Sequence, residues 1–163
     1  MMGCGKSYWM NKLSGRFKVP KYDLDQLIEN VEDRTIPQIF KESGEDHFRK
    51  MESIVLKWFA DKDEFILATG GGTPCYHNNM DWMNEQGITI FLDEPIDVLA
   101  DRLTPEKRHR PLISKLSDKK LKSYLEEKIN ERNAVYTKAK YVLKGDDISE
   151  QNLLSLINKN THA

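Results

Sequence analysis

The first residues of the chain carry glycines, a lysine and a serine at a spacing that suits phosphate binding. The segment Gly3-Cys4-Gly5-Lys6-Ser7 matches the second half of the pattern G-x-x-x-x-G-K-[ST], in which backbone N–H groups close around phosphate oxygens. A helix starting at the lysine adds its positive N-terminal end. The lysine then reaches the β- and γ-phosphates, and the serine holds Mg²⁺. The alternative is a disordered N-terminus that leads into an amphipathic helix.

Two carboxylates follow the first expected strand. Asp23 and Asp25 are two residues apart, and in extended chain this spacing puts both on one face. One carboxylate then serves Mg²⁺ through water while the other meets a substrate hydroxyl. The alternative is a helix N-cap at Asp25 with a solvated Asp23.

Three consecutive glycines, Gly70-Gly71-Gly72, follow an apolar segment that ends at Thr69. Glycine costs conformational entropy, and a turn with one left-handed residue needs only one glycine. The triplet therefore indicates that something approaches the backbone closely. The alternative is a plain tight turn.

Four arginines have the chemistry to capture carboxylate or phosphate through two parallel hydrogen bonds. Arg49 lies three residues before Glu52, which can orient it, while Arg102, Arg110 and Arg132 lie in the second half of the chain. Each alone is also typical of a surface ion pair.

The basic run from Lys107 to Arg110 lies in a polar segment, 104–116, that shows no helical or strand period. It is interpreted either as a solvated turn or as a mobile lid that brings positive charge to a transferring phosphoryl group.

The hydrophobic pattern places these residues on alternating strands and helices. Such alternation predicts a parallel sheet with helices on both faces, and ligands bind such sheets at the carboxyl ends of the strands. Ser14-Gly15 and Gly44 are expected to end helices, and Asp118 and Ser149 to cap them. The expected strands are 17–22, 64–69, 88–92 and 141–143, and the expected helices are 6–13, 27–31, 36–43, 45–60, 79–85, 96–103, 118–139 and a last one after 149.

Length and composition limit the classes of function. The chain has 163 residues, 39% hydrophobic and 31% charged, as in a single soluble domain. A net charge of −1 argues against nucleic-acid binding. No apolar run is long enough for a membrane span, and the N-terminus shows no signal peptide. Cys4 and Cys75 make neither a disulfide framework nor a metal motif, which favours a reduced, cytoplasmic protein.

Taken in order, these residues resemble the shikimate kinases, a P-loop family related to the nucleoside-monophosphate kinases. The resemblance covers nearly the whole chain. Its motifs are Gly3-x-Gly5-Lys6-Ser7, Asp23-Leu24-Asp25, Ile39-Phe40, Gly44-Glu45-x-x-Phe48-Arg49-x-x-Glu52, Ala68-Thr69-Gly70-Gly71-Gly72, Phe91-Leu92-Asp93, Arg102-Leu103, Arg110-Pro111-Leu112 and Arg132-x-x-x-Tyr136-x-x-Ala139.

The resemblance implies one domain over 1–160, with the three-layer α/β/α fold of P-loop kinases, a substrate-binding region over about 25–60 and a mobile lid over about 104–117. The family's first strand lies at the centre of a five-stranded parallel sheet. Neither that strand nor the first glycine of the phosphate loop is found before Met1. We therefore expect the chain as given to start late, and to be less stable and to bind ATP more weakly than a version with about six apolar residues and a glycine added before Met1.

The resemblance also implies the reaction: ATP and shikimate give ADP and 3-phosphoshikimate, a step of aromatic amino-acid biosynthesis. Residues implied in catalysis are Lys6, Asp25 and Arg110. Residues implied to bind shikimate are Asp25, Phe40, Phe48, Arg49, Gly71, Gly72 and Arg132. Residues implied to bind ATP are Gly3, Cys4, Gly5, Lys6, Ser7, Tyr8, Arg102 and Arg110, and those implied to hold Mg²⁺ are Ser7 and Asp23.

Two other functions stay open from the residues alone. One is another small-molecule kinase of this fold, such as a gluconate or nucleotide kinase, although the pair Arg49 and Arg132 with the triple glycine favours shikimate. The other is a binding protein whose catalysis is impaired, against which the retained Lys6, Asp25 and Arg110 argue. We expect a monomer with no membrane or nucleic-acid partner.

Overall fold

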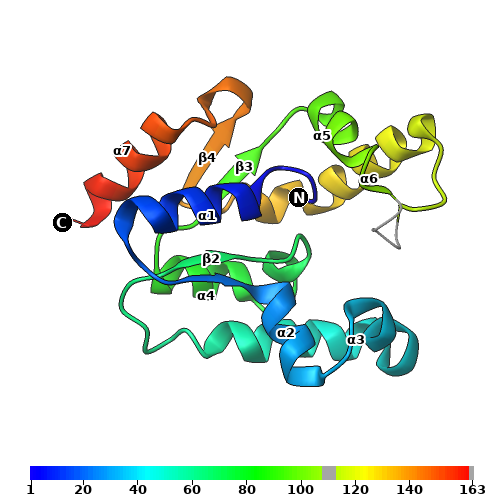
Figure 1. The fold of residues 1–163 in the computed structure, drawn as a ribbon, viewed down its shortest axis with the longest axis horizontal. Helices are drawn as coiled ribbons and strands as arrows, with labels where there is room; N and C mark the ends of the chain where they lie inside the picture. Colours follow the sequence, from blue (N-terminus) through cyan, green and yellow to red (C-terminus); the bar gives the residue numbers. More distant parts are fainter. Residues whose placement is uncertain (108–112, 162–163) are drawn as a thin grey trace. The chain divides into compact units, whose positions relative to one another are not determined.

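Helices and short parallel strands alternate along the chain in the computed structural model (Figure 1), which describes residues 1–107 and 113–161. The elements form two compact units, one of Gly5–Gln86 and one of Met1–Cys4 with the chain from Gly87 onward. Each unit has its own two-stranded parallel sheet. Of the described helices, none has the length and apolar character that crossing a membrane requires.

The unit Gly5–Gln86 pairs β1 with β2 in parallel, so the carboxyl ends of both strands meet at one edge. Asp23, the last residue of β1, is in register with Ala68 at the end of β2. The carboxylates after β1 and the glycines after β2 therefore leave the sheet at the same edge, as predicted. Its elements are α1 (Lys6–Phe17), β1 (Lys21–Asp23), α2 (Leu24–Glu32), α3 (Ile36–Lys57), β2 (Ile66–Ala68), η1 (Thr73–Cys75) and α4 (Asn79–Gln86).

Helices α2 and α3 share an apolar core that fixes α3 within this unit. Apolar residues recur every three or four positions on both helices, so each presents one apolar stripe. Fully buried aliphatic residues of the two stripes pack together, and this packing holds the middle of α3 in place. The buried core consists of Leu24, Ile28, Ile39, Phe48, Val55 and Leu56.

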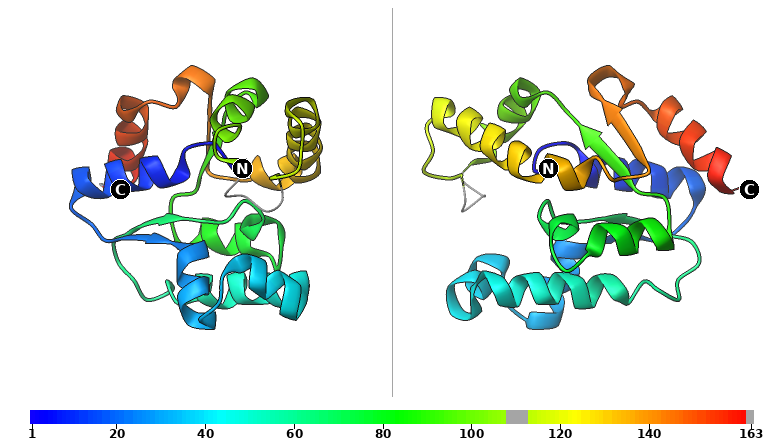
Figure 2. Two further views of the ribbon diagram at one scale, coloured as in Figure 1. Left: turned by 45° about the vertical axis from the view of Figure 1, so that its right-hand side comes forward. Right: turned by 180° about the vertical axis from the view of Figure 1, so that it is seen from behind.

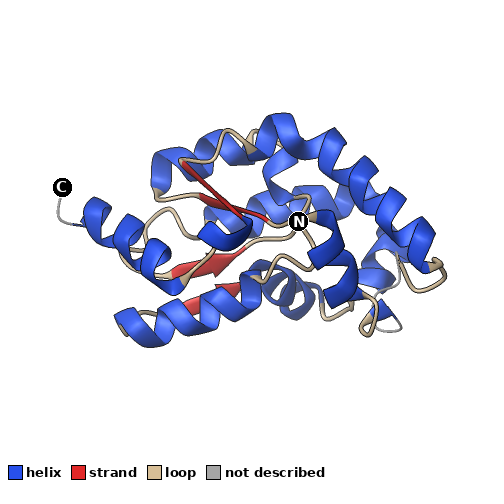
Figure 3. Cartoon of the chain, turned by 90° about the horizontal axis from the view of Figure 1, so that it is seen from above, coloured by secondary structure: helices blue, strands red, loops and turns tan. Residues whose placement is uncertain are grey.

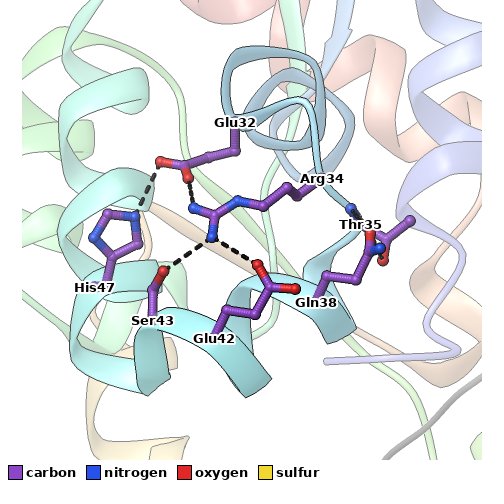
Figure 4. Close-up of polar contacts among 7 residues, drawn as sticks. All are labelled: Glu32, Arg34, Thr35, Gln38, Glu42, Ser43 and His47. Atoms are coloured by element: carbon purple, nitrogen blue, oxygen red, sulfur yellow. Dashed lines mark hydrogen bonds and ion pairs between the residues drawn. The ribbon is translucent and has the colours of Figure 1, made fainter.

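Helix α3 is kinked at Gly44, where the sequence predicts a break. Gly44 has φ 82° and ψ 170°, a conformation open to glycine and strained for other residues. The connection before α3 is tied to its first half by Arg34, whose guanidinium hydrogen-bonds Glu32, Glu42 and Ser43 (Figure 4). The kink and these hydrogen bonds together set the direction of the second half of α3, after Gly44.

The second unit repeats the strand–helix–strand arrangement. β3 and β4 pair in parallel, with Phe91 in register with Val142 (Figure 2). The ring of Phe91 packs 4.8 Å from that of the buried Tyr136, which anchors the end of α6 to the sheet. The elements are β3 (Ile90–Asp93), α5 (Ile96–Leu103), α6 (Asp118–Tyr136), β4 (Tyr141–Lys144), η3 (Gly145–Asp147) and α7 (Glu150–Thr161).

The described chain thus holds the four predicted strands between its helices (Figure 3). The first three are shorter than expected, and the last is one residue longer. The expected end of α1 at Ser14-Gly15 is wrong. The helix continues to Phe17 and ends where Lys18 takes a left-handed conformation and donates its N–H to the carbonyl of Ser14. A glycine inside a helix costs only about 1 kcal/mol, so it does not by itself end one.

Two expected helix caps are also displaced by one or two residues. Asp23, not Asp25, caps α2 by accepting the N–H of Asp25. Ser117, not Asp118, caps α6 by accepting the N–H of Lys120. In both cases the capping side chain precedes the first helical residue, as cap geometry requires. The cap expected at Ser149 is confirmed by its hydroxyl, which accepts the N–H of Asn152.

Candidate active site

At the start of α1 a left-handed glycine stands at the N-cap, where no side chain can cap the helix. Gly5, the N-cap, has φ 88° and makes no side-chain cap. The first N–H groups of a helix have no partner within it, and together with the helix dipole they attract anions. Lys6 is the first residue of this helix. The local geometry therefore suits a phosphate group, as the sequence predicts.

Ser7, the second residue of α1, faces the end of β1. Its hydroxyl donates a hydrogen bond to Oδ2 of Asp23 over 3.3 Å, while Oδ1 of Asp23 accepts the N–H of Asp25 over 3.1 Å. A hydroxyl and a carboxylate at this distance supply the oxygen ligands that Mg²⁺ prefers, and Mg²⁺ usually keeps several waters and few protein ligands. No cluster of three acidic, His or Cys ligands occurs within residues 1–107 and 113–161.

Asp25 lies in the first turn of α2, so the expectation that it shares an extended face with Asp23 is wrong. Burial raises the pKa of its carboxyl to about 6, with further increases from the negative Asp23 and Glu52. The positive Lys6 opposes these effects. Asp25 can therefore gain or lose a proton near neutral pH, a property of general bases.

The glycines after β2 leave room for functional side chains of the chain itself. A Cβ on Gly70 would lie 2.7 Å from Oδ1 of Asp25 and 2.7 Å from Oε1 of Glu52, and one on Gly72 would lie 2.4 Å from Nη1 of Arg49. Neither glycine has a positive φ. Side chains of the chain itself approach the backbone closely at these two positions, which a plain tight turn does not explain, and the approach of a ligand stays a prediction.

Arg49 is held in a fixed orientation by two carboxylates. Its Nη1 donates to Oε2 of Glu52 over 2.6 Å, and its Nε and Nη2 donate to Oε1 of Glu45 over 3.0 and 2.8 Å. Burial lowers the pKa of Arg49, but the hydrogen bonds and charges of Glu52 and Glu45 outweigh this effect and raise it. The sequence-based prediction that Glu52 orients Arg49 is confirmed.

Aromatic rings surround the Arg49 guanidinium. Its central carbon lies 4.6 Å from the ring centre of Tyr76, 5.3 Å from Phe48 and 5.9 Å from Phe40. The rings of Phe40 and Phe48 pack 4.8 Å apart. A planar cation beside apolar ring faces suits a small anion that carries an apolar ring.

A buried hydrogen-bond network supports Glu52 from the other side. The hydroxyl of Thr73 donates to Glu52, and the side-chain amide of Asn79 donates to the carbonyl of Thr73 over 2.9 Å. Ser53 donates to the Asn79 carbonyl oxygen over 2.9 Å. The network joins α3, η1 and the start of α4, so the turn after the glycines is fixed relative to Arg49.

The second unit carries the remaining described candidates. Arg102 donates to the carbonyl of Gly3 over 3.3 Å and pairs with Glu94 at 2.9 Å. It therefore steadies the beginning of the phosphate loop, where Gly3 has φ 74° and Cys4 is buried. Arg132 lies half-buried on α6.

The candidates divide between the two units. Tyr8, expected beside the nucleotide, is exposed in the unit Gly5–Gln86 and packs edge-on against Trp9. Arg110, with the rest of 108–112, lies outside the described residues. The unit Gly5–Gln86 contains Gly5, Lys6, Ser7, Tyr8, Asp23, Asp25, Phe40, Phe48, Arg49, Gly71 and Gly72, and the other contains Gly3, Cys4, Arg102 and Arg132.

Sequence reasoning missed the roles of Glu45, Ser53, Thr73, Tyr76 and Asn79 in holding this site. Glu45 stands four residues before Arg49, a spacing at which helical side chains pair, so a local signal for it existed. The other contacts join residues far apart in the chain. No local pattern marks them.

Comparisons with known proteins agree on one family. A family model described as shikimate kinase matches residues 2–160. A shikimate kinase of Phocaeicola vulgatus is 37% identical over 150 residues, which cover 92% of this chain and 86% of the relative. That of Aquifex aeolicus is 35% identical over 159 residues, which cover 95% and 91%.

Solved structures give the same result. The crystal structure of shikimate kinase from Bacteroides thetaiotaomicron matches with a TM-score of 0.86 at 32% identity, covering 99% of this chain and 92% of that one. Shikimate kinase from Acinetobacter baumannii, in complex with shikimate, matches with a TM-score of 0.86 at 29% identity, covering 98% and 89%. The predicted α/β P-loop kinase fold is confirmed, and the chain belongs to the shikimate kinase family.

Proposed function

We propose that this shikimate kinase transfers the γ-phosphoryl group of ATP to the 3-hydroxyl of shikimate, a step of aromatic amino-acid biosynthesis, with Arg49 as anion binder and Asp25 as base. One observation carries the assignment of roles. A buried, pre-oriented guanidinium and a carboxyl with a pKa of about 6 both pack against the glycines that follow β2. This is the chemistry that an anionic, polyhydroxylated acceptor requires.

The substrate carboxylate binds the fork of Arg49, with Arg132 as the second arginine of the clamp. A guanidinium fork matches the two oxygens of a carboxylate. The shikimate ring lies against Phe40 and Phe48, and the backbone N–H groups of Gly71 and Gly72 bind ring hydroxyls. The support is that the two aromatic rings already flank Arg49.

The phosphates of ATP bind the N–H groups at the start of α1 together with Lys6. Ser7 and Asp23 hold the Mg²⁺ ion, which neutralises phosphate charge when bound. Gly3, Cys4, Tyr8 and Arg102 complete the nucleotide site, and Arg110 adds positive charge from the lid. The support for the metal position is the hydrogen bond that already joins Ser7 to Asp23.

In the chemical step, Asp25 orients the attacking hydroxyl and takes its proton. The hydroxyl oxygen forms a bond to the γ-phosphorus while the bond from that phosphorus to the bridging oxygen breaks, and ADP leaves. Lys6 stabilises the charge on the phosphoryl oxygens. A carboxyl with a pKa of about 6 is ionised at neutral pH and still basic enough to accept a proton. We further propose that residues 1–160 act as one monomeric domain in the cytoplasm.

A coupled assay of ADP production tests this function. We expect ADP release that depends on shikimate and does not occur with gluconate or nucleoside monophosphates. Lys6→Ala and Asp25→Asn are expected to abolish most of it. Activity on another acceptor would contradict the substrate assignment, and full activity of either variant would contradict the assigned roles.

A further inference from the structure

The edge of Arg49 that suits an incoming carboxylate is already occupied by a carboxylate of the chain. Nε and Nη2 form one of the two forks that a guanidinium offers for bidentate binding. Both donate to the same oxygen of Glu45, over 3.0 and 2.8 Å. The hydroxyl of Tyr76 donates to that oxygen as well, over 3.4 Å. A substrate carboxylate that uses this fork must therefore compete with Glu45.

The two acidic partners of Arg49 differ in their freedom to move. The side chain of Glu52 is 1% exposed and also accepts the Thr73 hydroxyl, so separating it from Arg49 would leave a buried charge unpaired. The side chain of Glu45 is 52% exposed and can turn into water, where its charge is solvated. Of the two pairs, only the one with Glu45 can open at low cost.

We propose that Glu45 is a displaceable stand-in for the substrate carboxylate, holding the fork of Arg49 in the free enzyme and leaving it when shikimate binds. This proposal rests on the proposed role of Arg49 as the carboxylate binder. Glu52, Thr73 and the aromatic rings keep the guanidinium in place during the exchange.

The exchange has two opposite consequences for binding. Glu45 keeps Arg49 oriented, so little side-chain entropy is lost when the substrate arrives. It also weakens binding, because an existing ion pair must open first. Glu45 therefore raises the KM for shikimate, and it acts on binding rather than on the phosphoryl-transfer step.

The test replaces Glu45 by its neutral isostere. We expect Glu45→Gln to lower the Kd and KM for shikimate about fivefold, the size of one half-exposed ion pair, with kcat within about twofold of the original. Glu42→Gln is the matched control, because Glu42 lies on the same helix, pairs with Arg34 and has a side chain 54% exposed. It should change neither constant. Unchanged or weaker shikimate binding by Glu45→Gln would overturn the proposal.

A neutral ligand separates competition from a general change of the site. Calorimetric titration with the methyl ester of shikimate, which has no carboxylate, should show no gain in Glu45→Gln. An equal gain for acid and ester would overturn the proposal. Arg49→Lys, measured in the same way, tests the proposed role of Arg49 on which this inference rests. If Arg49→Lys keeps the original affinity for shikimate, the assignment of Arg49 as carboxylate binder fails. If Arg49→Lys loses affinity but Glu45→Gln gains none, only the displacement of Glu45 is rejected.

Discussion

Two arginines on either side of the kink in α3 show the same ion-pair pattern in different surroundings. Arg34 hydrogen-bonds Glu32 and Glu42 at the connection between α2 and α3 (Figure 4). Arg49 hydrogen-bonds Glu45 and Glu52 beyond the kink. The side chain of Arg34 is 28% exposed, and that of Arg49 is 10% exposed and faced by three aromatic rings.

The difference shows that an arginine between two carboxylates is not by itself a binding site. Hydrogen bonds from Arg34 and His47 lower the pKa of Glu32, and that local pairing holds a surface connection together. At Arg49 the surrounding water is replaced by rings and by a glycine loop, so a bound anion meets a charge that is poorly screened. Burial and the close approach of its guanidinium to Gly72 distinguish Arg49, the proposed anion binder, from Arg34.

The comparison is tested most strongly by replacing each arginine with lysine. Arg49→Lys keeps the charge but loses the fork, the contact with the rings and the geometry that satisfies Glu52. We expect kcat/KM for shikimate to fall about 1000-fold, the loss of roughly 4 kcal/mol of binding and positioning. Arg34→Lys is expected to keep kcat/KM within about twofold. Similar losses in both variants would remove the distinction.

Asp25→Asn tests whether the Asp25 carboxyl raises the rate of the reaction while lowering the stability of the fold. We expect kcat to fall about 100-fold, because the amide cannot accept the proton of the hydroxyl. In the original chain, kcat/KM should rise with pH through about 6 as Asp25 ionises. A pH-independent rate between 5 and 8 would argue against a role for this carboxyl.

The same variant should be more stable at high pH. The folded pKa of Asp25 lies above the ordinary value of 3.8, so the folded state holds the proton more tightly and loses stability as pH rises through about 6. The neutral amide introduced by Asp25→Asn would carry no such cost. Chemical denaturation should therefore show a free energy of unfolding about 3 kcal/mol higher for Asp25→Asn at pH 8, a difference that disappears below the unfolded pKa of 3.8.

The sequence predicts the fold well where local patterns decide it. The helix at Ile96–Leu103 and the break at Gly44 are confirmed, because an apolar period and a left-handed glycine are local properties. The end of α1 is missed, because Ser14 and Gly15 only weaken a helix and do not stop it. The lengths of the first three strands are overestimated, since pairing with a neighbour rather than propensity sets where a strand ends.

The site is predictable to a similar extent and for the same reason. The pair of Arg49 with Glu52 follows from helical spacing and is confirmed. The contacts of Tyr76 with Arg49 and of Thr73 with Glu52 depend on how a turn folds back onto α3, which no local pattern encodes. The position of Arg110 and the strand expected before Met1 stay predictions.

A methyl group added to the glycine loop should act through Arg49. A Cβ on Gly72 would lie 2.4 Å from Nη1 of Arg49, too close for the guanidinium to keep its place. We expect Gly72→Ala to raise the KM for shikimate about 20-fold, with a smaller loss of kcat. Gly15→Ala is the control, since a Cβ there meets nothing within 4 Å and alanine favours the helix. That variant should keep its KM and unfold at a slightly higher temperature. Normal kinetics of Gly72→Ala would show that Arg49 need not stay where the structure has it.

The smallest effect is expected from removing the Arg34 side chain. A near-absence of any kinetic effect would support the difference drawn between Arg34 and Arg49. Arg34→Ala removes contacts to Glu32, Glu42 and Ser43 that lie beside solvent, where side-chain entropy and salt screening offset most of the gain from pairing. We expect kcat and KM to stay within about twofold and the melting temperature to fall by about 2 °C.

This fall in melting temperature should be smaller in 1 M salt. It should vanish in acid once Glu32, whose pKa is lowered in the folded chain, becomes protonated. A large rise in the KM for shikimate would instead mean that the connection before α3 transmits its position to Arg49 across the kink at Gly44, and the two arginines would then belong to one functional unit.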